Sequence, residues 1–106
     1  MIALREQAMG NTRRIMTRLR AGRPVFRRYG VTRLALFGSA TRGTIRRNSD
    51  LDFLVEFDRP TFDSYMGVKE YLEGAFRRKV DLVVSDSVKP RLRARILGTA
   101  VDVPGL

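Results

Sequence analysis

Three short apolar segments with the composition of β-strands most constrain what this chain folds into. They read VTRLALF (31–37), LDFLVEF (51–57) and KVDLVV (79–84). In the second segment, Leu51, Phe53, Val55 and Phe57 fall on one face, and Asp52, Leu54 and Glu56 fall on the other. We therefore predict strands over all three segments, the first of them ending at Gly38.

Helical patterns surround these strands. Apolar residues recur at helical spacing around 11–20 and again over 62–76, and Pro24 and Pro90 suit the first turns of two further helices, the former ending at Gly30. AVDV (100–103) is expected to form a short final strand. This order predicts a single α/β (α+β) domain over residues 1–106, with a helical segment over about 1–30 and a small mixed β-sheet flanked by helices. Core periodicity assigns these aromatic residues to the interior: Phe26, Tyr29, Phe37, Phe53, Phe57, Phe62 and Phe76.

The absence of two residue types limits the chemistry of any site. The chain has no cysteine, which excludes disulfides and thiolate metal sites, and it has no histidine, the commonest general base. A bound metal must therefore be held by oxygen ligands, which favours Mg²⁺ or Mn²⁺. No apolar run approaches the roughly 20 residues of a membrane span, and the first residues lack a signal-peptide pattern. We expect a soluble, cytoplasmic protein without a membrane partner.

The net charge of +10 is unevenly distributed along the chain. Twelve arginines and a single glutamate precede Asp50, whereas nine basic and ten acidic residues lie from Asp50 onward. A cationic body favours anionic partners such as nucleotides, nucleic acid or an acidic protein. We interpret the arginines of the first helices as a solvated face or a partner surface, with direct nucleic-acid contact as the less favoured alternative: Arg13, Arg14, Arg18, Arg20, Arg27 and Arg28.

Two carboxylates open the second predicted strand. Asp50 and Asp52 are two residues apart, so their side chains project from the same face with Cα atoms roughly 6.5 Å apart. Carboxylates this close raise the cost of remaining ionised, and a divalent cation between them reverses that effect. The pair predicts a Mg²⁺ site.

The segment before this pair supplies groups suited to a phosphate. Gly38 allows the backbone to approach a ligand, and Ser39, if it begins a helical turn, directs its amide and hydroxyl at an anion. Arg42 follows within one turn and can add a charge-assisted contact to a phosphate oxygen. Ser49 belongs to the turn that returns the chain to the strand and is a further candidate for nucleotide contact. Hydrogen-bond donors that bind phosphate, placed beside metal ligands, are typical of sites for phosphoryl or nucleotidyl transfer.

A third carboxylate lies inside the third predicted strand. Asp81 has only apolar neighbours there, and an ionised group in such a strand needs a partner. If this strand lies beside the second, Asp81 can help to hold a second metal ion and can accept the proton of an attacking hydroxyl.

The segment GSATRGTIRRNSDLD (38–52) resembles the signature of the polymerase-β-like nucleotidyltransferases, Gly-Ser followed after ten residues by Asp-x-Asp. More closely, it resembles the minimal nucleotidyltransferases (MNT) that act as antitoxins in HEPN/MNT toxin–antitoxin pairs. The segments SDLDFLVEF, RKVDLVV and KPRLRARIL extend the likeness over about residues 12–103. The resemblance implies the polymerase-β-like nucleotidyltransferase fold.

The same resemblance implies roles for individual residues. Gly38 and Ser39 would bind the triphosphate of ATP, Asp50 and Asp52 would ligate one or two Mg²⁺ ions, and Asp81 would be the third catalytic carboxylate. The implied activity is transfer of AMP from ATP onto a tyrosine of a partner HEPN ribonuclease, which silences that toxin.

Two other functions remain open on the sequence. The chain can act as an antitoxin that neutralises its toxin by docking alone, or as a nucleotidyltransferase that modifies a small molecule or RNA. At 106 residues we expect no second domain to hold a small substrate, which favours an acceptor on another chain. A homodimer is also compatible with the sequence.

Overall fold

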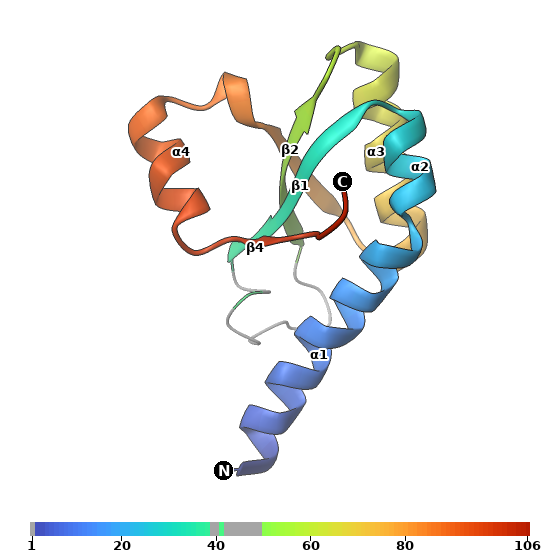
Figure 1. Ribbon diagram of the computed structural model, residues 1–106. Coiled ribbons are helices and arrows are strands. Elements are labelled where there is room, and N and C mark those ends of the chain that lie inside the picture. Colours follow the sequence, from blue (N-terminus) through green and yellow to red (C-terminus); the bar gives the residue numbers. More distant parts are fainter. Residues whose placement is uncertain (1, 39–40, 42–49) are drawn as a thin grey trace.

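The computed structural model describes residues 2–38, 41 and 50–106, with side chains from Thr12 onward (Figure 1). Its elements follow the predicted order: α1 (Ile2–Ala21), α2 (Arg23–Arg28), β1 (Val31–Phe37), β2 (Leu51–Phe57), α3 (Phe62–Phe76), β3 (Val80–Val84), η2 (Ser85–Ser87), α4 (Pro90–Leu97) and β4 (Val101–Asp102). The predicted strands and helices are confirmed. The first helix is longer than its apolar pattern indicated, and its first half extends beyond the end of the sheet in Figure 1.

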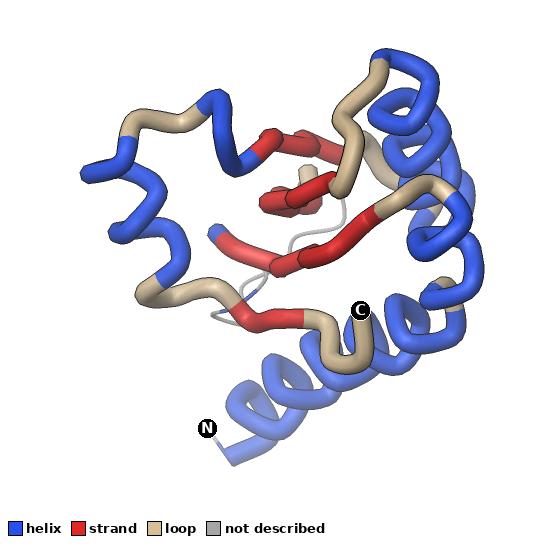
Figure 2. Tube along the Cα trace, turned by 45° about the horizontal axis from the view of Figure 1, so that its top comes forward, coloured by secondary structure: helices blue, strands red, loops and turns tan. Residues whose placement is uncertain are grey.

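The four strands form one mixed sheet in the order β3-β2-β1-β4. β1 pairs antiparallel with both β2 and β4, whereas β2 and β3 run parallel. Helices α1, α2 and α3 cover one face of the sheet, and α4 lies on the opposite side (Figures 1 and 2). The predicted mixed sheet flanked by helices is therefore confirmed.

A β-bulge near the start of β1 places its apolar residues on the core side. Val31 pairs with Phe57, but the register shifts between Val31 and Arg33, after which Leu34 pairs with Val55. Because a bulge adds one residue to one strand only, it reverses which face the following side chains occupy. Val31 and Leu34 are thus both buried although they are three residues apart.

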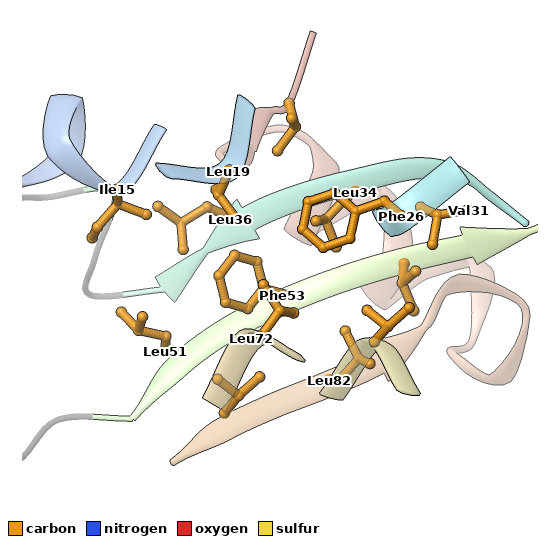
Figure 3. Packing of buried hydrophobic residues seen from close by; sticks show 14 of the residues in the cluster. Ile15, Leu19, Phe26, Val31, Leu34, Leu36, Leu51, Phe53, Leu72 and Leu82 are labelled. Atoms are coloured by element: carbon orange, nitrogen blue, oxygen red, sulfur yellow. The ribbon is translucent and has the colours of Figure 1, made fainter. Parts of the chain in front are cut away.

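The core lies between the sheet and the three helices on its covered face (Figure 3). Phe26 and Phe53 are fully buried there, and Phe26 meets Tyr71 of α3 edge-to-face at a centroid distance of 5.4 Å. The assignments of Phe62 and Phe37 to this core are wrong. The Phe62 side chain is 77% exposed. Phe37 lies outside the core cluster, since it pairs with Asp52 and projects from the opposite face of the sheet. Phe62 is the first residue of α3, and its side chain points away from the helix stripe that packs on the sheet.

The predicted solvated face of the first helices is also confirmed. The six arginines assigned to it are exposed, and Arg18 additionally donates a hydrogen bond to the Ala75 carbonyl and lies over the Phe76 ring. None of the helices in the described part of the chain combines the length and apolar character needed to cross a bilayer.

The N-terminus of helix α3 is capped by a side chain that is expected to stabilise the fold. The Thr61 hydroxyl accepts a hydrogen bond from the Ser64 backbone amide at 3.0 Å. Loss of such a cap costs about 1 kcal/mol, so Thr61→Ala is expected to lower the free energy of unfolding by that amount. Urea titration of Thr61→Ala beside Thr61→Ser, which keeps the hydroxyl, measures the effect. Equal stabilities of the two variants would contradict it.

Candidate active site

Two of the predicted carboxylates are direct neighbours across the sheet. Asp52 of β2 is the register partner of Asp81 of β3, and both strands run in the same direction. Paired residues of adjacent strands project from the same face, with a strand spacing of about 4.8 Å. The face they share is the one opposite α1, α2 and α3, because the alternate residues Leu51 and Phe53 belong to the core. The condition on which the role of Asp81 depended, that the third strand lies beside the second, is therefore met.

The third carboxylate adds its charge to this pair. Asp50 immediately precedes β2 and is exposed, as is Asp81, whereas Asp52 is half-buried. The pKa of Asp52 is raised above its ordinary value, first by burial and then by the negative charges of Asp81 and Asp50. The charges of Asp81 and Asp50 therefore disfavour the ionised form of Asp52 at this end of the strands.

The donor set of this cluster suits a hard divalent cation, since it consists of carboxylate oxygens and the chain has neither histidine nor cysteine. Within residues 2–38, 41 and 50–106, however, no three such side chains stand close enough together to surround a metal ion. Asp52 and Asp81 thus share a face, and Asp50 adds its charge to Asp52. Ligation of one ion by these carboxylates would require the side chains to move toward it.

Gly38 brings the end of β1 against the Asp52 carboxylate. Its φ of +77° lies in the left-handed region that favours glycine. A Cβ at this position would overlap Oδ2 of Asp52 and would lie 3.3 Å from Cγ. Its neighbour Phe37 is the register partner of Asp52, so the turn after β1 starts directly beside the cluster. Gly38 is therefore required both for the turn and for the close approach to Asp52. The sequence predicted that this backbone approaches a ligand and did not indicate its contact with the carboxylate.

Three predicted nucleotide-binding residues, Ser39, Arg42 and Ser49, lie outside the described residues. Thr41, which belongs to the same connection, donates a hydrogen bond from its hydroxyl to the Gly38 carbonyl at 2.8 Å. The structure thus brings together Gly38, Asp50, Asp52 and Asp81 of the predicted site.

Contacts from neighbouring elements fix the strand that carries Asp81. The Tyr65 hydroxyl of α3 donates a hydrogen bond to the Leu82 carbonyl at 2.7 Å. The Val80 amide donates to the Glu73 carboxylate at 3.3 Å, and the Leu51 amide donates to the Lys79 carbonyl at 3.1 Å. Asp81 is therefore flanked on both sides by residues whose backbone is anchored, which limits its movement along the strand.

A pocket that the sequence did not indicate adjoins this cluster. It has a volume of about 270 Å³ and lies between the end of β1 and helix α4. Its walls are Phe37, Gly38, Thr41, Leu92, Arg95, Ile96 and Thr99. The sequence feature that could have indicated the pocket is the amphipathic pattern of α4. The spacing of its apolar residues does not show which surface of the domain they face.

Comparison with known proteins identifies the family. The sequence model of the nucleotidyltransferase domain family matches residues 20–103 of this chain. Protein adenylyltransferase MntA of Thermococcus cleftensis is 36% identical over 77 residues, which are 72% of this chain and 78% of that protein.

Solved structures agree with this match. A chain assigned by name to the minimal nucleotidyltransferases is 35% identical, with a TM-score of 0.77 over 86% of this chain and 94% of the other. A toxin–antitoxin structure with AMP-PNP is 27% identical, with a TM-score of 0.64 over 91% of this chain and 74% of the other. Because the family model covers most of the chain and the solved structures share its fold, this chain belongs to the nucleotidyltransferases and is one of their minimal members.

Proposed function

We propose that this enzyme transfers AMP from ATP, with Mg²⁺, to a tyrosine hydroxyl of a partner toxin of the HEPN class and acts as its antitoxin. The observation that carries the proposal is the pairing of Asp52 with Asp81 beside Gly38. The name of the T. cleftensis relative and the AMP-PNP in the related toxin–antitoxin structure support a protein acceptor and an adenine nucleotide.

The carboxylates would divide the reaction between them. Asp50 and Asp52 would hold Mg²⁺, which when bound neutralises charge on the triphosphate and the leaving pyrophosphate. Asp81 is exposed at the same edge and would accept the proton of the acceptor hydroxyl. The hydroxyl oxygen then forms a bond to the α-phosphorus, the bond from the α-phosphorus to the bridging oxygen breaks, and pyrophosphate leaves.

Gly38 would place the triphosphate against this cluster. Because it has no side chain, a phosphate can approach the backbone where β1 ends, next to the Asp52 carboxylate. Ser39, Arg42 and Ser49 would complete the contacts to the phosphates. Two phosphate-directed cations, Mg²⁺ and the Arg42 guanidinium, would then offset the repulsion between the triphosphate and the three carboxylates.

The test is the mass of the partner. A partner is sought among the proteins encoded next to this chain by an Arg-x4-His motif, and the candidate is incubated with the enzyme, ATP and Mg²⁺. We expect its intact mass to rise by one or more AMP units, and EDTA to prevent the rise. A toxin that is inhibited by this chain without any change in mass would instead establish neutralisation by docking.

A further inference from the structure

The pocket between β1 and α4 has the character of a ligand site. Helix α4 has no buried residue, and Leu92 on it is 52% exposed. Leu92 lines the pocket together with Ile96 of the same helix and Phe37 of β1, so three apolar side chains from two elements face the same space. The polar groups at the pocket are few, with Arg95 the one cation among its walls. Apolar walls with a small number of polar groups are typical of sites for small organic ligands.

The position of the pocket ties it to the carboxylate cluster. Gly38 forms part of its wall and also lies against the Asp52 carboxylate. Phe37, on the same wall, is the register partner of Asp52. A molecule in the pocket would therefore be in contact with the residues that adjoin the triphosphate site, so the two sites are parts of one continuous surface.

We propose that this pocket binds the nucleobase of the nucleoside triphosphate, an inference that rests on the proposed function. Its volume of about 270 Å³ suits one planar ring system rather than a whole nucleotide, since sites for larger ligands begin at about 300 Å³. Phe37 supplies aromatic surface, Leu92 and Ile96 supply aliphatic surface, and Arg95 supplies donors for the nitrogen or oxygen acceptors of the base.

The experiment compares a ligand that has a base with one that lacks it. The dissociation constants of ATP and of inorganic tripolyphosphate, both with Mg²⁺, are measured by calorimetry for the full chain and for Leu92→Ser. We expect the substitution to weaken ATP binding about tenfold and to leave tripolyphosphate binding unchanged, because only ATP loses a contact to its base. Leu92→Met, which keeps the apolar surface, is expected to restore ATP binding.

Phe62→Ser is the matched control. Phe62 is the other exposed large hydrophobic residue of the described chain, 77% exposed on α3 and outside the pocket walls. Both substitutions remove exposed apolar surface, so neither is expected to lower the melting temperature appreciably, and Phe62→Ser should bind both ligands as the parent chain does.

The outcomes separate this inference from the function on which it rests. If Leu92→Ser binds ATP as tightly as the parent chain, the base lies elsewhere and the inference is overturned while nucleotide transfer stands. If Leu92→Ser keeps its affinity for ATP but modifies the partner more slowly, the pocket receives the acceptor rather than the base. If the parent chain binds neither ATP nor tripolyphosphate, both the inference and the proposed function fail.

Discussion

Asp52→Asn is expected to abolish AMP transfer and, at the same time, to raise the melting temperature of the chain. The loss of activity should be about a thousandfold or more, because the variant lacks a carboxylate proposed to hold the metal at the reacting phosphate. The gain in stability follows from the raised pKa of Asp52, whose ionised form is disfavoured in the fold by burial and by Asp81 and Asp50. A neutral amide of the same shape removes that cost.

The pH dependence of this effect has a definite sign. A carboxyl whose pKa is raised by folding favours the folded state below its unfolded pKa, and this contribution is lost as the pH rises through the folded value. At neutral pH the ionised Asp52 is therefore destabilising, and the advantage of Asp52→Asn is expected there. The advantage should shrink as the pH falls toward the ordinary range of aspartate, about 3.9.

Thermal unfolding between pH 4 and pH 8 measures this effect, with Asp86→Asn as the control. Asp86 is an exposed aspartate whose carboxylate lies 3.7 Å from the Arg93 guanidinium, outside the cluster. Its substitution is expected to leave both the melting temperature and AMP transfer almost unchanged. A lower melting temperature for Asp52→Asn at neutral pH would show that the carboxylate is stabilising in the fold, contrary to the electrostatics described here.

Gly38→Ala is expected to lower activity by about a hundredfold, because a small displacement at the reacting centre has effects of this size. An alanine at position 38 would introduce both backbone strain and a steric overlap. A side chain with a φ of +77° is strained by about 1–2 kcal/mol, and the added Cβ would overlap the Asp52 carboxylate. To relieve the overlap, either the carboxylate or the end of β1 must move, which displaces a proposed metal ligand or the phosphate site.

Gly30→Ala separates the effect of backbone strain from the effect of steric overlap. Gly30 has a φ of +78°, and a Cβ there would meet nothing within 4 Å. Gly30→Ala therefore carries the backbone strain without the steric overlap, and we expect it to lower stability by about 1–2 kcal/mol while AMP transfer is retained. Initial rates of partner modification and urea titrations of both variants check this. Equal activity of Gly38→Ala and Gly30→Ala would show that the approach of Gly38 to Asp52 has no catalytic importance.

Much of the fold and part of the site could be predicted from local pattern. Asp50 and Asp52 are two residues apart, a spacing that predicted their proximity, and the negative charge of Asp50 does act on Asp52. The pairing of Asp52 with Asp81 needed one further assumption, that β2 and β3 are neighbours, and that assumption is confirmed. Proline and glycine marked the ends of α2 correctly because each restricts or permits specific backbone angles.

The features that could not be predicted depend on contacts between distant segments or on local deviations. The bulge between Val31 and Arg33 breaks the alternation of β1, and simple periodicity cannot place it. Phe62 follows the apolar stripe of α3 in sequence, but at the first position of that helix it faces solvent. The pocket beside Phe37 is formed with α4, more than 50 residues later in the chain, and only the three-dimensional structure shows that they meet.

The most direct test of the central claim is a crystal structure of the chain with Mn²⁺ and a non-hydrolysable ATP analogue, with the metal located by its anomalous scattering. The claim predicts an anomalous peak at ligand distance, about 2 Å, from carboxylate oxygens of both Asp50 and Asp52, with a triphosphate oxygen as a further ligand. Binding of the analogue with no metal peak at these two residues, or with the metal held elsewhere, would contradict it.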